Sequence, residues 1–289
     1  MNKLTSSAKV RKTVANVFVH ILLAILSIIW LFPILWIILI SFKKEQGLYM
    51  ESIFPKAYTL DNYKKLFTDR KIFDFPQMFL NTLIIAIFVC IISTFLVLAV
   101  SYCMSRMRFR MRKPFMNVAL VLGMFPGFMS MIATYYILKA LGLTQGGLIR
   151  VSLVLVYSAG AGLGFYIAKG FFDTIPKSVD EAAYIDGATR WQVFTRITIP
   201  LSKPIIVYTV LGSFMGPWLD FIFAKVICGA ESQYYTVSIG LWNMLEREYI
   251  DRWFNCFAAG AVCISVPIAI LFMVMQKFYK EGVSGAVKG

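Results

Sequence analysis

The sequence predicts an all-α, polytopic membrane protein with six transmembrane helices and a helical hairpin on the cytoplasmic side, between spans four and five. Composition supports this prediction, because 59% of the 289 residues are hydrophobic, only 15% are charged and the mean hydropathy is +0.72. Soluble domains are typically about half apolar and about a quarter charged. The apolar residues also gather into six runs, each long enough to cross roughly 30 Å of hydrocarbon as a helix.

The six runs cover residues 17–40, 82–100, 115–138, 148–168, 205–227 and 257–275. Strands of a membrane barrel would be about ten residues long and would alternate in polarity. These runs do not alternate, so helices are predicted. The first run is followed by Ser41-Phe42-Lys43-Lys44 and not by a small-residue cleavage site, which indicates a retained anchor and not a signal peptide.

The spans divide the chain into an N-terminal segment, a first span, an outer loop, a transport core and a tail. The predicted boundaries are 1–16 for the cytoplasmic N-terminus, 17–40 for span one, 41–81 for the outer loop, 82–280 for the five-span core and 281–289 for the cytoplasmic tail. Within the core, the hairpin covers residues 176–200 and an outer loop covers residues 229–255.

The distribution of charge predicts the orientation of the spans. The net charge is +14, and most basic residues fall in segments that share one side of the membrane, including Arg106, Arg108, Arg110, Arg112 and Lys113. Basic residues concentrate in cytoplasmic loops, so a multi-pass protein of a bacterial-type plasma (inner) membrane with both termini cytoplasmic is predicted. The charge follows topology and no nucleic-acid motif accompanies it, so no nucleic-acid partner is expected.

Patterns that catalyse reactions or bind cofactors are missing from the sequence. There is no GxxxxGK[ST] phosphate loop, no cysteine pair with metal-ligand spacing and only one histidine, His20, which we interpret as a packing residue of span one. We therefore expect a non-catalytic chain with no metal or cofactor of its own. Cys228 and Cys256 bracket the last outer loop, which leaves a disulfide between them as an alternative to two free thiols.

Asp220 is the acidic residue that falls inside a predicted span. It follows Gly216-Pro217, where a helix is expected to kink or break, and a carboxylate there can accept backbone N–H groups freed by the break. Lys225 is a further candidate partner. Lining or gating of a transport path and ion relay are the alternative roles. An ion-coupled secondary transporter would require more ion-binding groups than Asp220, and a membrane-embedded enzyme would require a cluster of such groups.

Two capping patterns predict the hairpin between spans four and five. Ser178 and Glu181 have capping-box spacing, as do Thr189 and Gln192, and Gly187 falls where the first helix should end. Pro200 and Pro204 are expected to end the second helix before span five. Ala182 and Ala183 leave one surface of the first helix low, which suits insertion into a groove of a partner.

This hairpin resembles the EAA loop of ABC importer permeases. The matching residues are Glu181-Ala182-Ala183, Gly187, Ile197, Ile199 and Pro200, with isoleucine at 199 where leucine is usual. The six-span layout, Asp186-Gly187-Ala188-Thr189 and the glycine-bearing tail Gly282-Val283-Ser284-Gly285-Ala286-Val287-Lys288-Gly289 are similar to the carbohydrate type-1 permeases, and above all to the six-span maltose/maltodextrin subunits.

The resemblance implies a transport subunit driven by a separate ATPase. The implied partners are a second permease in a heterodimer, a dimer of cytoplasmic ATPase subunits that bind ATP and Mg, an extracytoplasmic sugar-binding protein and the lipid bilayer. It implies ATPase coupling by Glu181, Ala182, Ala183, Asp186, Gly187 and Arg190, and ATPase contact by the tail residues Gly285, Val287, Lys288 and Gly289. Trp218 and Asp220 are candidates for lining the path. Maltose/maltodextrin-type oligosaccharides are the expected substrates, with an ABC permease for another substrate class as the alternative.

Overall fold

The computed structural model describes the backbone of residues 2–47, 54–160 and 164–286, and the side chains from residue 12 to residue 278 within those ranges. The described residues form helices and turns, with an isolated antiparallel bridge between Lys43 and Tyr58. The chain divides into two compact units. One comprises residues 1–68 and 244–262, and the other comprises residues 69–243 and 263–289.

The first unit contains α1 (Asn2–Ser41), α2 (Asp61–Thr68) and the beginning of α14 (Ile250–Ala286). Two buried asparagines hold the chain where it leaves α1. The Asn62 amide donates to the carbonyls of Ser41 and Lys43 at 3.0 and 2.7 Å, and the Asn255 amide donates to those of Lys43 and Glu45 at 3.1 and 2.8 Å. These bonds satisfy backbone acceptors that the end of a helix leaves without partners.

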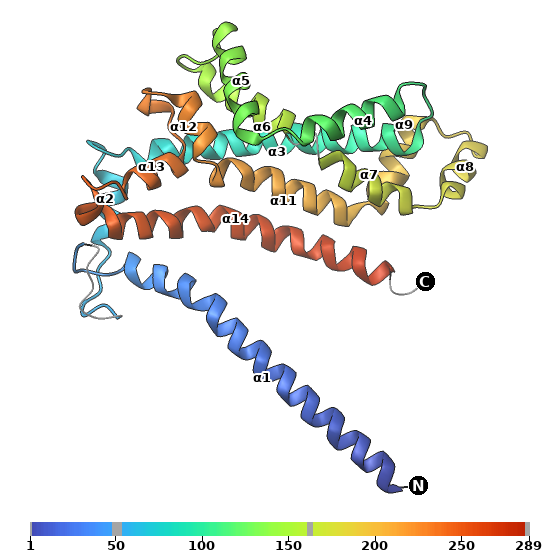
Figure 1. Ribbon diagram of the computed structural model, residues 1–289, viewed down its shortest axis with the longest axis horizontal. Helices are drawn as coiled ribbons and strands as arrows, with labels where there is room; N and C mark the ends of the chain where they lie inside the picture. The colour runs from blue at the N-terminus through green and yellow to red at the C-terminus, as the bar shows by residue number, and fades with distance from the viewer. Residues whose placement is uncertain (1, 48–53, 161–163, 287–289) are drawn as a thin grey trace. The chain divides into compact units, whose positions relative to one another are not determined.

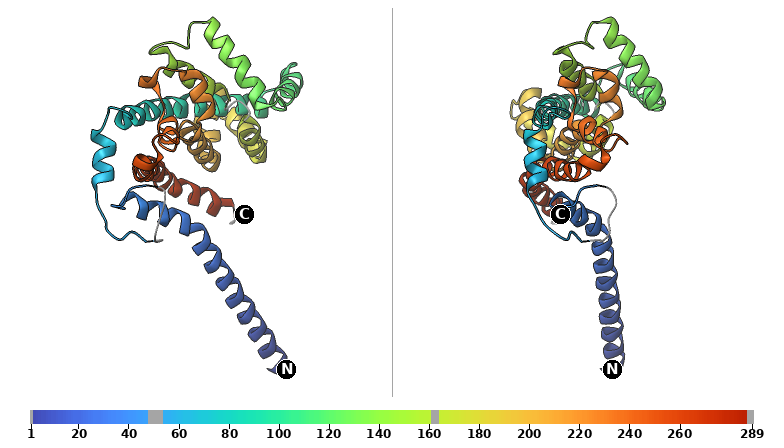
Figure 2. Two further views of the ribbon diagram at one scale, coloured as in Figure 1. Left: turned by 60° about the vertical axis from the view of Figure 1, so that its left-hand side comes forward. Right: turned by 90° about the vertical axis from the view of Figure 1, so that its left-hand side faces the viewer.

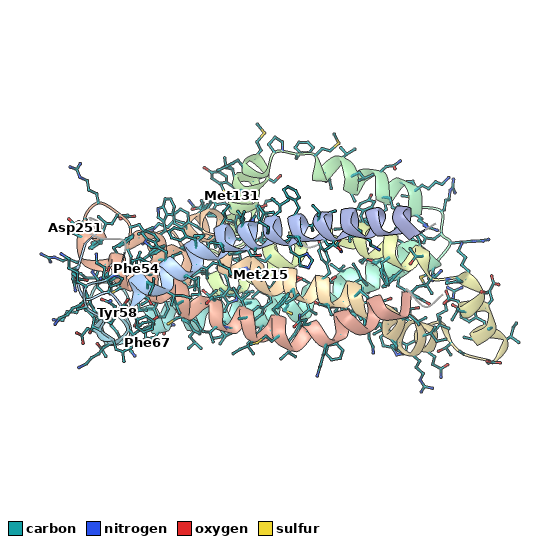
Figure 3. All side chains as sticks on the ribbon, turned by 90° about the horizontal axis from the view of Figure 1, so that it is seen from below. Phe54, Tyr58, Phe67, Met131, Met215 and Asp251 are labelled. Carbon is teal, nitrogen blue, oxygen red and sulfur yellow. The ribbon has the colours of Figure 1, made fainter. Side chains whose placement is uncertain are left out.

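Exposed apolar side chains cover α1 on every side between Val14 and Ile38, and Phe18, Ile28 and Trp30 are 67%, 68% and 75% exposed. Figure 3 shows side chains standing out from the helices of both units. A helix that is hydrophobic all round is buried in a large core or in a membrane. The span predicted at 17–40 therefore lies inside a longer helix of membrane-spanning character.

The second unit is built on α3 (Phe75–Arg106), the longest helix within it. Asp74 caps its start by accepting from the Gln77 backbone N–H at 3.2 Å. α6 (Leu148–Gly160), α7 (Phe165–Thr174) and α11 (Lys203–Leu219) all pack on α3, and α11 lies along its length (Figures 1 and 2). The remaining helices are α4 (Arg112–Gly123), α5 (Gly127–Ala140), α8 (Lys177–Ile185), α9 (Arg190–Val193), α10 (Ile199–Leu201), α12 (Ile222–Cys228) and α13 (Val237–Asn243).

The membrane spans differ from the expected straight runs. Three helices can cross a membrane by themselves: Lys12–Ser41, Phe75–Arg106 and Ile250–Phe278. Three further spans are bent helix pairs, so the described residues provide up to six, in agreement with the predicted all-α fold. The run predicted at 115–138 is two helices bent by 102°. Its break falls at Pro126, which cannot donate a hydrogen bond and disfavours a helical residue before it.

Two further runs are also interrupted. The run predicted at 148–168 bends by 41° between α6 and α7, and the run predicted at 205–227 ends as α11 at Leu219 and resumes as α12. The tail predicted from residue 281 begins as helix, since α14 continues to Ala286. Apolar composition locates a span but does not reveal whether tertiary partners satisfy the backbone at a break within it.

The beginning of α3 is tied to the loop that follows α12. The Asn81 amide donates to the carbonyls of Gln233 and Tyr235 at 2.9 and 3.0 Å, and its oxygen accepts from the Arg150 guanidinium at 2.7 Å. The same guanidinium lies over the Tyr234 ring, 5.1 Å from its centroid. These contacts join α3, α6 and the 3-10 turn Ser232–Tyr234.

Candidate coupling hairpin and transport path

The predicted hairpin is present as α8 followed by α9. α8 begins directly after Pro176, whose extended ψ of 133° marks the helix boundary. The prediction that Ser178 caps this helix is wrong, because the helix starts one residue earlier and Ser178 makes no capping hydrogen bond. Proline is well suited to a helix start, since its φ is already helical and the N–H that it lacks would have no partner there.

The turn after α8 is satisfied entirely by local hydrogen bonds. Gly187 has a φ of +82°, and its N–H donates to the Tyr184 carbonyl at 3.1 Å. The Ala188 N–H donates to the Ala183 carbonyl at 2.9 Å, which completes a Schellman motif. The predicted capping box of α9 is confirmed, because the Thr189 N–H donates to Gln192 Oε1 at 2.7 Å and the Gln192 N–H donates to Thr189 Oγ1 at 3.3 Å.

The second half of the hairpin does not end at Pro200 as predicted. The π-helix Phe194–Thr198 follows α9 and leads into α10, which contains Pro200. In this wider turn the Ile199 N–H donates to the Phe194 carbonyl, five residues earlier. The helical segment instead ends at Ser202, where the chain turns by 84° into α11, and Pro204 lies in the first turn of α11.

The hairpin presents most of its predicted coupling residues to its surroundings. Glu181, Ala182, Asp186, Gly187 and Arg190 are exposed. Ala183 is an exception, because it is 9% exposed and faces the interior. The low surface expected from two alanines therefore consists of Ala182 without Ala183.

Sequence reasoning missed the exposed apolar residues of the hairpin. Ile185 is 86% exposed and Trp191 is 64% exposed, although both occur in an apolar pattern that is typical of a core. Tyr184, at 42%, extends this surface. Large apolar side chains at the tip of a hairpin, beside Glu181 and Asp186, are typical of a surface that a partner protein covers.

Asp220 occupies the break between α11 and α12. The break comes three residues after Pro217, which α11 accommodates inside the helix. Asp220 Oδ2 accepts from the Ala224 N–H at 3.0 Å and Oδ1 accepts from the Phe223 N–H at 3.3 Å, so the carboxylate receives backbone donors in the expected manner. The Tyr157 hydroxyl donates to Oδ2 at 2.6 Å. Lys225 donates instead to the Tyr235 hydroxyl, at 3.2 Å.

A cavity of about 700 Å³ borders Asp220. Its walls come from α5, α6 and α12 and combine a few polar groups with aromatic and sulfur-containing side chains. The lining includes Asp220, Ser130, Thr134, Phe128, Phe223 and Met131, the last labelled in Figure 3. Small-molecule sites typically have such mixed walls, with a small number of polar groups in an apolar surface.

Trp218 lies in the packed interior instead of on a cavity wall. It is 1% exposed and contacts the Phe79 ring edge-on, with the ring centroids 5.2 Å apart. Phe214 covers another side at 5.9 Å. In this conformation the indole holds α11 against α3.

The remaining predicted residues lie near the C-terminus and in the predicted outer loop 229–255. Gly285 is in the last turns of α14, whereas Val287, Lys288 and Gly289 lie outside the described residues. In the predicted outer loop, Trp242 is 55% exposed and stacks on Phe221, with the ring centroids 4.8 Å apart. The structure shows all five cysteines as free thiols.

Comparison with known sequences identifies one matching family and several similar permease proteins. Residues 97–285 match the family described as "Binding-protein-dependent transport system inner membrane component". The galactooligosaccharides transport system permease protein GanQ of Bacillus subtilis is 34% identical over 283 residues, which cover 97% of this chain and 98% of GanQ. The maltodextrin permease protein MalD of Streptococcus pneumoniae is 30% identical, covering 99% of this chain and 100% of MalD.

Comparison with solved structures supports the fold. A chain of a bacterial ABC transporter involved in the import of the acidic polysaccharide alginate superposes with a TM-score of 0.75 at 21% sequence identity, covering 93% of this chain and 98% of that one. A chain of the alginate transporter in complex with an alginate pentasaccharide-bound periplasmic protein has a TM-score of 0.62 at 15% identity. The helical arrangement is therefore that of a chain of this alginate transporter.

Proposed function

This chain belongs to the family of binding-protein-dependent transport system inner membrane components, and on that premise we propose that it is the permease subunit of an ATP-driven sugar importer. Members of this family are multi-pass membrane subunits of transport systems and not catalysts. ATP is hydrolysed by a separate pair of cytoplasmic ATPase subunits, which hold the ATP and Mg. A second permease subunit completes the membrane channel, and both termini of this chain face the cytoplasm.

The observation that carries this proposal is the surface of the α8–α9 hairpin. Five of the six predicted coupling residues are exposed on it, and Ile185 and Trp191 add apolar area. A rigid, locally capped element with an uncovered apolar tip is suited to docking in a cleft of the ATPase. Closure of the ATPase dimer on ATP then displaces the hairpin and switches the spans between inward-facing and outward-facing states, with the substrate passing near the midplane.

The substrate class follows from the relatives and from the chemistry of the cavity at Asp220. The relatives transport galacto-oligosaccharides and maltodextrins, so we propose a hexose oligosaccharide, with these two sugar types as the specific candidates. A carboxylate and two hydroxyl side chains can hydrogen-bond sugar hydroxyl groups, while Phe128 and Phe223 offer apolar faces to the sugar ring. In this proposal Asp220 lines the path, whereas Trp218 packs between α3 and α11.

The outer loop and the tail contribute the remaining contacts. The exposed Trp242 is suited to contact with the extracytoplasmic sugar-binding protein, which delivers the substrate. Gly285 and the residues that follow it are proposed to contact the ATPase subunits. A binding protein accompanies the alginate transporter in one of the similar structures, which supports the same arrangement here.

Purification from the native membrane in mild detergent tests the proposal. A pair of ATPase subunits and a second permease should co-purify in stoichiometric amounts. In reconstituted vesicles, uptake of labelled maltotriose or galactobiose should require both ATP and the binding protein. A chain that purifies alone and transports on an ion gradient without ATP would instead indicate the secondary transporter.

A single surface variant tests the docking role of the hairpin. Ile185→Ser removes an exposed side chain, so folding and membrane insertion should be unchanged, whereas ATPase co-purification should fall by about tenfold, the effect of losing one interface hot spot. Leu201→Ser, which alters an apolar residue that is 51% exposed in α10 and not in α8, is the control. Full ATPase retention by Ile185→Ser would exclude the tip of α8 from the interface.

A further inference from the structure

A buried ion pair joins the coupling helix α8 to the end of α3. Arg106 is the last residue of α3, Asp180 lies in the first turn of α8, and Arg106 Nε is 3.1 Å from Asp180 Oδ2. Their side chains are only 4% and 8% exposed. The same guanidinium donates through Nη2 to the carbonyl of Ile175, the residue that ends α7, at 2.8 Å. One side chain of α3 therefore contacts both α8 and the C-cap residue of α7.

Because this ion pair is buried, its two charges separate less readily than those of an exposed pair. Ion pairs at a protein surface exchange their partners for water at little cost. When one partner of a buried pair moves away, a charge is left in a medium that solvates it poorly. Arg106 and Asp180 are therefore expected to move together when α8 is displaced.

The last turns of α3 hold the rest of the hairpin as well. The Tyr102 ring packs against Phe194 with the ring centroids 4.8 Å apart, which secures the segment after α9. Ser105 donates to Asp173 Oδ1 at 2.6 Å, and Asp173 Oδ2 pairs with Lys169 Nζ at 2.5 Å, which secures α7. The Arg106–Asp180 pair is the ion pair between α8 and this group, and Tyr184 of α8 adds a side-chain hydrogen bond to Tyr102.

Two adjacent carboxylates on α8 have opposite environments. Asp180 is directed into the protein toward Arg106, whereas Glu181 is exposed on the docking surface. A displacement imposed at Glu181 therefore reaches a buried charge within one residue. From Arg106 it passes into α3, against which α6, α7 and α11 all pack.

We infer that the Arg106–Asp180 ion pair is the latch that transmits movement of α8 to α3, which makes Arg106 and Asp180 positioning residues for coupled transport. This inference rests on the proposed function, because it requires an ATPase that displaces α8. It assigns coupling to a residue of α3 far from the hairpin in sequence. Its consequence is that docking and transmission are separable: the exposed face of α8 binds the ATPase, and the buried face passes the motion on.

Matched substitutions in the complete transporter, purified with its ATPase and binding protein and reconstituted in vesicles, test the latch. Asp180→Asn removes the charge at nearly constant shape, and Asp180→Glu retains the charge. Asp180→Asn should keep ATPase co-purification and basal ATP hydrolysis, but uptake of labelled maltotriose or galactobiose per ATP hydrolysed should fall by about tenfold or more. Asp180→Glu should recover at least about half of the coupled uptake, as retention of the charge predicts.

A double-mutant cycle adds a second criterion. Arg106→Gln should lower coupled uptake at least as much as Asp180→Asn does, because it also removes the hydrogen bond to the Ile175 carbonyl. The double variant should be no worse than Arg106→Gln alone, because the ion pair is already lost in that variant. Arg108→Gln, which removes an exposed arginine two residues further on, is the matched control and should leave coupling unchanged.

Several results would overturn the latch. These are normal uptake per ATP in Asp180→Asn, loss of ATPase co-purification in that variant, no recovery in Asp180→Glu, or additive losses in the cycle. Failure of the proposed function is distinguishable, because it would appear in the unsubstituted protein as transport without ATP or as an absence of bound ATPase.

Discussion

The turn at Gly187 and the break at Asp220 interrupt helices in contrasting ways. At Gly187 the hydrogen bonds come from residues within five positions along the chain, through the Schellman motif and the Thr189 capping box. At Asp220 the local backbone bonds are supplemented by distant residues. Tyr157 of α6 donates to the carboxylate, and Ser238 of α13 donates to the Asp220 carbonyl at 2.5 Å.

This difference corresponds to the environments of the two sites. The Gly187 turn is exposed to a partner protein, and its local hydrogen bonds can maintain its shape when a partner binds. The Asp220 break lies within an apolar unit, where every backbone polar group requires a partner inside the protein. One interruption is therefore an independent rigid element, and the other depends on the packing around it.

The largest expected effect is that of Gly187→Asp. A non-glycine residue in the left-handed region costs about 1–2 kcal/mol, and the added charge lies at the docking surface. We expect uptake to be abolished while the chain inserts normally, as measured by vesicle transport and membrane fractionation.

Gly142→Asp provides the matched control for backbone strain. Gly142 has a φ of +71° in the turn after α5, outside the hairpin. This variant should retain most of the uptake. Normal transport by a well-expressed Gly187→Asp variant would show that the turn has no part in coupling.

Asp220→Ala should produce the largest loss of stability. It removes the acceptor of two backbone N–H groups and leaves the Tyr157 hydroxyl without its partner, at a cost of about 2 kcal/mol. Thermal unfolding of the purified complex should show a lower transition temperature. Asp220→Asn retains one acceptor oxygen, so its transition temperature should fall by less. An unchanged transition temperature in Asp220→Ala would contradict the capping role.

Tyr157→Phe measures how much the hydrogen bond from Tyr157 to Asp220 contributes to stability at the same break. It deletes the long-range donor and leaves both backbone bonds in place, so the expected loss is about 1.5 kcal/mol, typical of a hydrogen bond to a charged group. The double variant with Asp220→Ala should be no less stable than Asp220→Ala alone. Additive losses in the same unfolding experiment would mean that the two side chains act independently.

Thr189→Ala should have the smallest effect, about 1 kcal/mol, because it removes one cap of a short, exposed helix. The loss should appear as faster hydrogen exchange at the Gln192 amide, with little change elsewhere. Ser178→Ala is the control, since Ser178 caps nothing and its removal should not alter exchange in α8. Equal effects of the two variants would restore the capping role predicted for Ser178.

The hairpin could be predicted from sequence to the extent that its structure is local. The Gly187 turn and the Thr189 cap depend on residues that adjoin them, so their spacing was sufficient. The Ser178 prediction was wrong because the same spacing occurs one residue inside the true helix start, where Pro176 marks the boundary. The exposure of Ile185 and Trp191 could not be predicted, because a pattern of apolar residues does not reveal which of them a partner covers.

The sequence by itself determined the membrane class, the approximate places of the spans, the capped hairpin and the family resemblance, since all of these depend on composition or on short-range spacing. Only the tertiary structure decided that the run at 115–138 is bent, that Asp220 is paired with Tyr157, and that Arg106 lies buried against Asp180. These features join residues far apart in the chain. The physical reason is that a buried polar group must find a partner wherever the fold brings one close, and neither composition nor periodicity specifies which partner that is.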